Sequence, residues 1–379
     1  MSTLGIWLGL RELRRDRRRS LLALVTLATL TWLAVTLAAL TDTLDRDSTG
    51  VLRGSDADLV IFDADARRQL ARSRVPQPLA ASLLRVEGVR EVGTLGLVPT
   101  SVALGGDRLR VTLVGFNART PAEPSRIVDG RVPVDGEPRV AAVDVALADR
   151  GVALGDRLVL AGDREVEVVG VVDDASYLLQ PTIWVPPETW AQARRRALPE
   201  AGWAESLAGA SLVRVAEDAD RAAVAARIVE EVGDLEVVTV REAIAAIPGV
   251  EVQRTLLGGL LAVNVAVLGL VAGLLFALLV TERRAVLATL AALGAPRRVL
   301  PVALLTQAIV AWALALLAGT VAALVLAGGL PETVPIRLRG SVLAALGVAL
   351  LAAVLLGSLA ALRRIMALDP VETLEEAPT

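Results

Sequence analysis

The sequence predicts an α-helical membrane protein with four transmembrane helices and an α+β extracytoplasmic domain inserted between the first and the second. Two observations lead to this fold class. Four long runs carry no charged residue, and a single polar segment of roughly 210 residues separates the first run from the other three. The chain of 379 residues is also 54% hydrophobic, which is above the roughly 45–50% of soluble domains.

Each uncharged run is long enough to cross a bilayer, since about 20 helical residues span a hydrocarbon core of about 30 Å. The predicted spans are 21–40, 256–280, 299–326 and 341–362. The first run has the basic flank of a signal peptide, but its twenty residues exceed the usual apolar region of about 7–15. Residues 1–20 place Ile6, Leu10 and Leu13 on one helical face, followed by six arginines, which predicts a short helix in the membrane interface.

Arginine placement predicts the orientation, because the cytoplasmic flanks of transmembrane helices carry more basic residues. Twelve arginines flank the runs on one side: Arg11, Arg14, Arg15, Arg17, Arg18, Arg19, Arg283, Arg284, Arg297, Arg298, Arg363 and Arg364. Six flank them on the other: Arg46, Arg53, Arg241, Arg254, Arg337 and Arg339. We therefore expect both termini, the tail 363–379 and residues 281–298 to be cytoplasmic, and residues 41–255 and the loop 327–340 to be extracytoplasmic. The arginine-rich composition suggests a bacterial cell membrane.

The insert 41–255 is acidic, with 34 carboxylates and 25 arginines, which argues against nucleic acid as a partner. Its strand-like stretches and helical patches alternate as in an α+β domain. Expected strands are 57–62, 92–104, 108–115, 157–161, 165–172, 211–215 and 236–240, and expected helices are 78–87, 143–150, 220–232 and 241–247. Gly105-Gly106-Asp107 predicts a hairpin, and the last four elements a βαβα unit. The insert is long enough for two lobes, with a seam near residues 181–199.

Three acidic clusters in the insert are candidates for metal binding or acid–base chemistry. Asp45 to Asp56 overlays an EF-hand loop, but its twelfth residue is Asp and a strand follows, so a solvated linker leaving the membrane is the favoured interpretation. Asp173-Asp174 and Glu230-Glu231 suggest paired carboxylates for acid–base chemistry. Adjacent strand residues point to opposite faces, however, and the glutamates fall on a polar helix face, so neither pair is expected to be catalytic.

The residue inventory excludes many enzyme classes. The chain contains no lysine, histidine or cysteine. It therefore has no P-loop lysine, Ser-His-Asp triad, thiol nucleophile, disulfide or structural zinc site. We expect a subunit without catalytic activity, cofactor or metal. No charged residue lies within a predicted span, so the energy for any transport must come from a partner.

The cytoplasmic segment 281–298 carries an apolar stripe at helical spacing that Gly294 and Pro296 terminate. Two interpretations are open: the segment packs under its own spans, or it docks into a groove on a cytoplasmic partner. For docking, the candidate residues are Glu282, Arg283, Arg284, Leu287, Leu290, Leu293 and Gly294.

Within the spans, few residues are polar. Asn264 and Gln307 are the most costly to leave unpaired in lipid, so we expect them to face other helices. Gly269 and Gly273 form a GxxxG pair that allows close helix approach, consistent with a dimer seam.

Several motifs together resemble one family, the MacB/FtsX-like permeases of ABC transporters. The segment ERRxxLATLxALGAxRR at 282–298 is similar to its coupling segment, and DPVETL at 369–374 to its C-terminal ending. LGDRLxL at 154–160, VEVVGVV at 166–172 and TIWVP at 182–186 resemble its periplasmic core domain. The ATL form of the coupling segment is closest to DevC- and HrtB-type exporter permeases.

The resemblance implies a permease subunit that couples ATP hydrolysis by a separate cytoplasmic ATPase to export or mechanotransmission. It implies a second copy or a paralogous permease as a further partner, contact with membrane lipid, and a periplasmic adaptor. The alternative is an FtsX-like regulatory scaffold that activates an extracytoplasmic cell-wall hydrolase.

Overall fold

The computed structural model describes residues 17–76, 79–104, 106–160, 164–197, 207–282, 299–329 and 337–366. They fall into two compact units: a helical unit within Met1–Thr43 and Thr255–Thr379, and an α+β domain, Leu44–Arg254. Residues 1–16, which make up most of the predicted interfacial helix, lie outside the described residues. Residues 283–298, 330–336 and 367–379 lie outside them as well.

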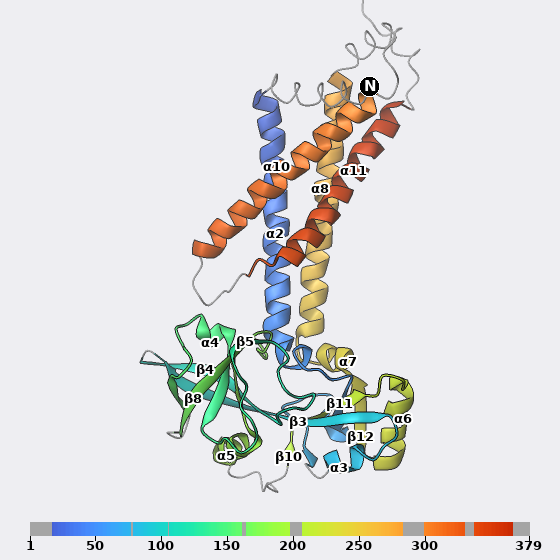
Figure 1. Cartoon of the computed structure of the whole chain (residues 1–379). Helices are drawn as coiled ribbons and strands as arrows, with labels where there is room; N and C mark the ends of the chain where they lie inside the picture. The colour runs from blue at the N-terminus through green and yellow to red at the C-terminus, as the bar shows by residue number, and fades with distance from the viewer. Residues whose placement is uncertain are drawn as a thin grey trace, which may run out of the picture. The chain divides into compact units, whose positions relative to one another are not determined.

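Four long helices make up the apolar part of the chain (Figure 1): α2 (Arg17–Arg53), α8 (Val250–Glu282), α10 (Val299–Gly329) and α11 (Gly340–Met366). Among the described residues, four segments are long and apolar enough to cross a membrane: Leu21–Arg53, Val250–Leu278, Leu305–Gly329 and Gly340–Ala360. The four predicted apolar helices are therefore present in the predicted order. All four extend beyond the predicted spans, most of all α2, which continues to Arg53, and α8, which begins at Val250.

Small residues allow the helices of the helical unit to approach closely. A Cβ added to Gly269 of α8 would lie 3.1 Å from the carbonyl oxygen of Ala353, and one added to Gly273 would lie 2.9 Å from that of Gly357. The GxxxG pair of α8 is thus covered by α11 of the same chain. Trp312 of α10 donates its indole N–H to the carbonyl oxygen of Gly347 on α11, at 3.0 Å.

The α+β domain is built on one large sheet with the strand order β12-β1-β11-β3-β4-β9-β6-β8-β5. Its strands are β1 (Leu59–Asp63), β3 (Val89–Leu104), β4 (Asp107–Phe116), β5 (Ile127–Gly130), β6 (Val140–Asp144), β7 (Arg157–Leu160), β8 (Arg164–Val172), β9 (Thr182–Val185), β11 (Ala210–Val215) and β12 (Leu235–Thr239). Strand β7 pairs with both β3 and β8, so β3, β4, β9, β6, β8 and β7 close into a barrel. The short strands β2 (Val75–Pro76) and β10 (Leu207–Ala208) form a separate pair.

Short helices cover this sheet: α3 (Leu79–Leu83), α4 (Val145–Ala148), α5 (Pro187–Ala197), α6 (Arg221–Val232), α7 (Val240–Ala245) and the 3-10 turn Ala64–Ala66. Their starts follow from local chemistry, since a side-chain oxygen at the N-cap accepts an otherwise unpaired backbone N–H. Asp220 caps α6 by accepting from the N–H of Ala223 at 3.1 Å. Thr239 and Glu242 form a capping box at α7.

Alternation along β1 divides the buried side chains between two faces, as the two-residue period of a strand requires. Leu59 and Ile61 pack with Leu83 of α3 and Ile228 of α6. Val60 and Phe62 point the other way, into the largest cluster of the domain. A third cluster fills the barrel, where the ring of Trp190 from α5 covers two strands at positions where only glycine fits.

Several expectations for the insert are confirmed. The hairpin joins β3 to β4, and the β11-α6-β12-α7 series follows the expected βαβα order, with β1 between β11 and β12. Two were wrong. The expected seam at 181–199 is instead a central strand, β9, and the helix α5. The linker expected from Asp45 to Asp56 is helix up to Arg53, because the α+β domain binds its charged residues.

Candidate functional site

The last ten residues of α2, Leu44–Arg53, are part of the α+β domain and are named here the α2 end. Val51 and Leu52 are buried, and the Leu52 side chain is 0% exposed. They belong to the same cluster as Val60 and Phe62 of β1 and Trp184 of β9. Burying a leucine side chain stabilises a fold by about 1.5–3 kcal/mol, so the α2 end contributes to the core instead of merely leading into it.

Asp174 holds the α2 end through ion pairs. This residue lies in the β8–β9 loop, residues 173–181, and its side chain is 3% exposed. Its carboxylate accepts a hydrogen bond from Arg46 at 2.6 Å, and Arg53 lies at 3.7 Å on the other carboxylate oxygen. Arg126 approaches at 3.8 Å from the segment before β5. A buried carboxylate is costly unless it is paired, and here the partners come from α2 and from the sheet edge.

A second carboxylate of the α2 end binds the beginning of α8. The Asp45 carboxylate accepts hydrogen bonds from Arg53, which is on the same helix, at 3.0 Å and from Arg254 at 2.5 Å. Arg254 lies in the first turns of α8, so Asp45 links the helix that enters the domain to the helix that leaves it. Asp45, the first residue of the sequence overlay on an EF-hand loop, is therefore paired with arginines.

Backbone contacts bring the α2 end and the β8–β9 loop still closer. A Cβ at Gly50 would lie 2.8 Å from backbone atoms of Asp174 and Ser176, and one at Gly54 would lie 2.7 Å from the carbonyl oxygen of Asp174. These distances are too short for any side chain at either position. Three backbone hydrogen bonds cross the contact: Val51 N–H to Ser176 at 3.2 Å, Leu178 N–H to Ser48 at 3.2 Å, and Leu179 N–H to Asp47 at 2.8 Å.

The β8–β9 loop is in turn fixed to the barrel. Thr182 of β9 donates its hydroxyl to the carbonyl oxygen of Ala175 at 2.8 Å and accepts from the indole N–H of Trp184. Ser176 donates to Asp144 at the end of β6. Burial raises the pKa of Tyr177 in the same loop to about 12, so its phenol remains protonated at neutral pH.

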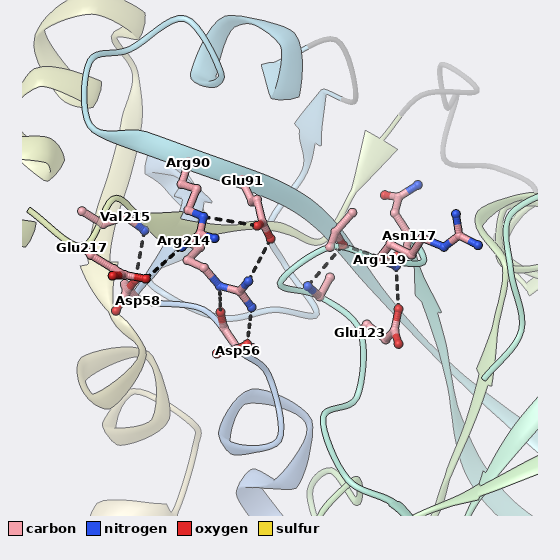
Figure 2. Close-up of polar contacts among 12 residues, drawn as sticks. Asp56, Asp58, Arg90, Glu91, Asn117, Arg119, Glu123, Arg214, Val215 and Glu217 are labelled. Atoms are coloured by element: carbon pink, nitrogen blue, oxygen red, sulfur yellow. Dashed lines mark hydrogen bonds and ion pairs between the residues drawn. The ribbon is translucent and has the colours of Figure 1, made fainter. Parts of the chain in front are cut away.

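The connection from α2 to β1 is fixed by a row of alternating charges (Figure 2). Arg214 of β11 pairs with Asp56, donates to its carbonyl oxygen at 3.1 Å, and pairs with Glu91 of β3 at 3.0 Å. Arg90 continues the row to Glu217 at 3.2 Å. Since Glu91 and Arg214 are opposite each other in the β3–β11 register, this row crosses two strands.

Asp58 completes the attachment of this connection. Its carboxylate accepts from the N–H of Val215 at 2.9 Å and pairs with Arg221 at 2.6 Å. A groove of about 680 Å³ lies over these residues, lined by Asp56, Ala57, Asp58, Arg90, Arg214, Val215, Ala216, Glu217, Ala219, Asp220 and Arg221. Its arginines and carboxylates are largely paired with one another. No group of three or more side chains suited to a metal ion occurs in the described part of the chain.

The structure separates the residues singled out in the sequence. Glu282 is the last residue of α8, and the other six docking candidates, Arg283 to Gly294, lie outside the described residues. Asn264 and Gln307 are buried in the helical unit. Glu230 and Glu231 are exposed on α6, whereas Asp173 and Asp174 lie in a loop and not on a strand. The interpretation of that pair from strand alternation was wrong.

The contacts that the α2 end makes with the β8–β9 loop and with α8, together called the junction, were missed in the sequence because the partners are distant in the chain. Arg46 and Asp174 are 128 residues apart, and Asp45 and Arg254 are 209 apart. The one local signal was the spacing Gly50-x-x-x-Gly54, which is typical of close helix packing.

The comparisons with known proteins agree with this fold. The model of the family described as MacB-like periplasmic core domain matches residues 20–231. No curated protein sequence matches the chain.

Three solved structures are similar to parts of the chain. The periplasmic region of MacB from Actinobacillus actinomycetemcomitans is 15% identical, with a TM-score of 0.39, and the match covers 52% of this chain and 96% of that one. The extracellular domain of the noncanonical ABC-type transporter YknZ from Gram-positive bacteria is 16% identical, with a TM-score of 0.34, over 48% of this chain and 100% of that one. A domain of a permease protein from Porphyromonas gingivalis is 16% identical, with a TM-score of 0.32, over 48% and 89%.

The family match covers more than half of the chain and includes the α2 end, both anchoring carboxylates and most of the sheet. Together with the four apolar helices, it confirms the resemblance noted in the sequence. The chain belongs to the MacB/FtsX-like family of ABC transporter permeases.

Proposed function

We propose that this protein is the membrane subunit of an ABC transporter in a bacterial cell membrane, and that it couples ATP hydrolysis by a separate subunit to export or mechanical work outside the membrane. The observation that carries this proposal is the continuity of α2. One helix runs from the apolar segment to the buried residues Val51 and Leu52 of the α+β domain. A displacement of that helix therefore has to act on the domain core.

The four apolar helices are the proposed spans, with both termini in the cytoplasm and the α+β domain outside. The twelve-to-six arginine asymmetry supports this orientation. A reporter that is active only outside the cytoplasm tests it. Fused after Thr379 it gives no signal, and inserted at Gly136, an exposed turn, it gives one. The reverse pattern contradicts the orientation.

We propose a separate protein as the ATPase, because these 379 residues contain no lysine that could bind the nucleotide phosphates in a P-loop. Family membership implies such a partner. We place its docking site on residues 282–294, whose apolar stripe has charged residues before it and a glycine after it. By this proposal, closure of two ATPase subunits moves the spans, and α2 and α8 carry the movement to the α+β domain.

A second copy of the chain, or a paralogous permease, completes the proposed complex. The glycine pair on α8 is not available for that contact, since α11 covers it. The other face of α8 presents an exposed apolar row, Val252, Leu256, Leu260, Val263, Leu270 and Leu274. We assign this row to lipid and to the second permease. A periplasmic adaptor remains a proposed further partner.

Affinity purification in mild detergent tests the function. The expected result is that an ABC ATPase co-purifies with the wild-type chain and is lost with Leu290→Asp, since a charge in the apolar stripe costs about 2–4 kcal/mol at a buried contact. Leu84→Asp is the matched control, because Leu84 is 52% exposed on the α+β domain. Retention of the ATPase by Leu290→Asp contradicts the docking site. A co-purifying cell-wall hydrolase favours the regulatory scaffold over export.

A further inference from the structure

We infer that the β8–β9 loop is a second, non-covalent attachment of α2, and that this attachment delivers the motion of α2 to the barrel. Its role in coupling rests on the proposed function, whereas its existence as a separable contact does not. The covalent route leads from α2 through residues 54–58 to β1, which lies outside the barrel. The loop instead joins β8 to β9, two strands within it.

The contact is dense for its size. Two ion pairs, three backbone hydrogen bonds and two glycine positions without room for a Cβ connect the α2 end and the adjoining Gly54 to the nine residues of the loop. Beyond the contact, hydrogen bonds continue from Ala175 to Thr182 on β9 and from Ser176 to Asp144 on β6. A pull on the α2 end therefore reaches two barrel strands without passing through β1.

The loop also holds backbone conformations that it would not adopt alone. Asp174, Leu178 and Leu179 have φ of 55°, 48° and 62°. Such left-handed conformations cost about 1–2 kcal/mol for each leucine, and they persist where surrounding contacts determine them. Here the N–H groups of both leucines donate to carbonyl oxygens of the α2 end. Separation of the helix from the loop thus removes the contacts that hold the strained residues, which makes the attachment a two-state element.

The chain offers a clean reporter for this element, because it contains no cysteine. Ala175 lies in the loop and is 2% exposed, so a thiol in Ala175→Cys reacts with a water-soluble maleimide only when the loop opens. Ala141→Cys, buried in the barrel on β6, reports opening of the whole domain. The ratio of the two labelling rates separates local release from global unfolding.

The perturbing variants are Gly50→Ala and Gly54→Ala, and the matched control is Gly258→Ala on α8, where an added Cβ meets nothing within 4 Å. Helix propensity alone predicts that alanine at Gly50 stabilises α2 by about 0.5–1 kcal/mol. The inference predicts the opposite. In Gly50→Ala and Gly54→Ala, Ala175→Cys is labelled about ten-fold faster or more, equivalent to about 1.4 kcal/mol, while the labelling rate of Ala141→Cys is unchanged. In the Gly258→Ala control, both labelling rates are unchanged.

Asp174→Asn is a second kind of perturbing variant, since asparagine tolerates a left-handed backbone while the charge is removed. It is expected to accelerate loop labelling in the same direction. Unchanged labelling in both glycine variants and in Asp174→Asn overturns the inference, and so does equal acceleration at both reporters in the glycine variants. The full chain with its ATPase completes the test: ATP is expected to change the loop rate. If ATP leaves that rate unchanged while the ATPase stays bound and active, the coupling role of the loop is refuted and the proposed function is not.

Discussion

Removal of the Asp174 charge is expected to destabilise the α+β domain strongly. Breaking a buried ion pair by removing one partner costs about 3–5 kcal/mol, because the other charge stays buried and uncompensated. Arg46 and Arg53 keep 21% and 28% of their side chains exposed, and Arg53 retains Asp45. Solvent therefore reduces the penalty, and we expect about 2–3 kcal/mol for Asp174→Asn.

In a domain of this size, 1 kcal/mol shifts Tm by about 2–4 °C, so the expected decrease is roughly 5–10 °C. Near-ultraviolet circular dichroism during heating reports the domain, because Trp184 and Trp190 lie in its buried clusters. The control is Glu217→Gln. It removes the charge of Glu217, which pairs with Arg90 and whose side chain is 92% exposed, and it is expected to lower the free energy of unfolding by about 0–1 kcal/mol. Equal Tm values for the two variants would refute the anchoring role of Asp174.

Three further substitutions test other parts of the structure. Gly357→Ala places a methyl group against the backbone of α8 and should cost about 1–3 kcal/mol, measured as detergent thermostability against Gly328→Ala, which has open space. Leu52→Ala should cost about 2–5 kcal/mol in denaturant unfolding of the α+β domain; a loss below 1 kcal/mol, about what an exposed site gives, contradicts its core position. Hydrogen bonds from Thr239 lower the pKa of Glu242 below 4.5, so this stabilisation is present above that pH and lost as the pH falls through the folded-state pKa. The stability difference between wild type and Glu242→Gln should therefore shrink in acid, and a constant difference excludes the carboxylate as its source.

Most of the secondary structure could be predicted because its causes are local. The spans follow from uncharged runs, α6 from the cap at Asp220, and the β3–β4 hairpin from a glycine turn between two apolar strands. Strand β9 was harder. It has only four residues between Pro181 and Pro186, and it is a strand because the barrel buries both of its faces.

The junction could not be predicted, because its stability comes from contacts between distant parts of the chain. Asp45 to Gly50 is rich in acidic and small residues that are typical of a turn or linker. It remains helical because Arg254 compensates the charge of Asp45 and Asp174 compensates that of Arg46, and because the loop backbone fits against Gly50. Asp174 is 128 residues from Arg46, and Arg254 is 209 residues from Asp45.

The central claim is that ATP hydrolysis on one side of the membrane moves the domain on the other side. Hydrogen–deuterium exchange of the purified complex, with and without ATP, tests it most directly. The account predicts that exchange changes at the α2 end and in the β8–β9 loop, residues 44–53 and 173–181, when ATP is added. Unchanged exchange throughout residues 44–254 while the partner hydrolyses ATP would contradict it.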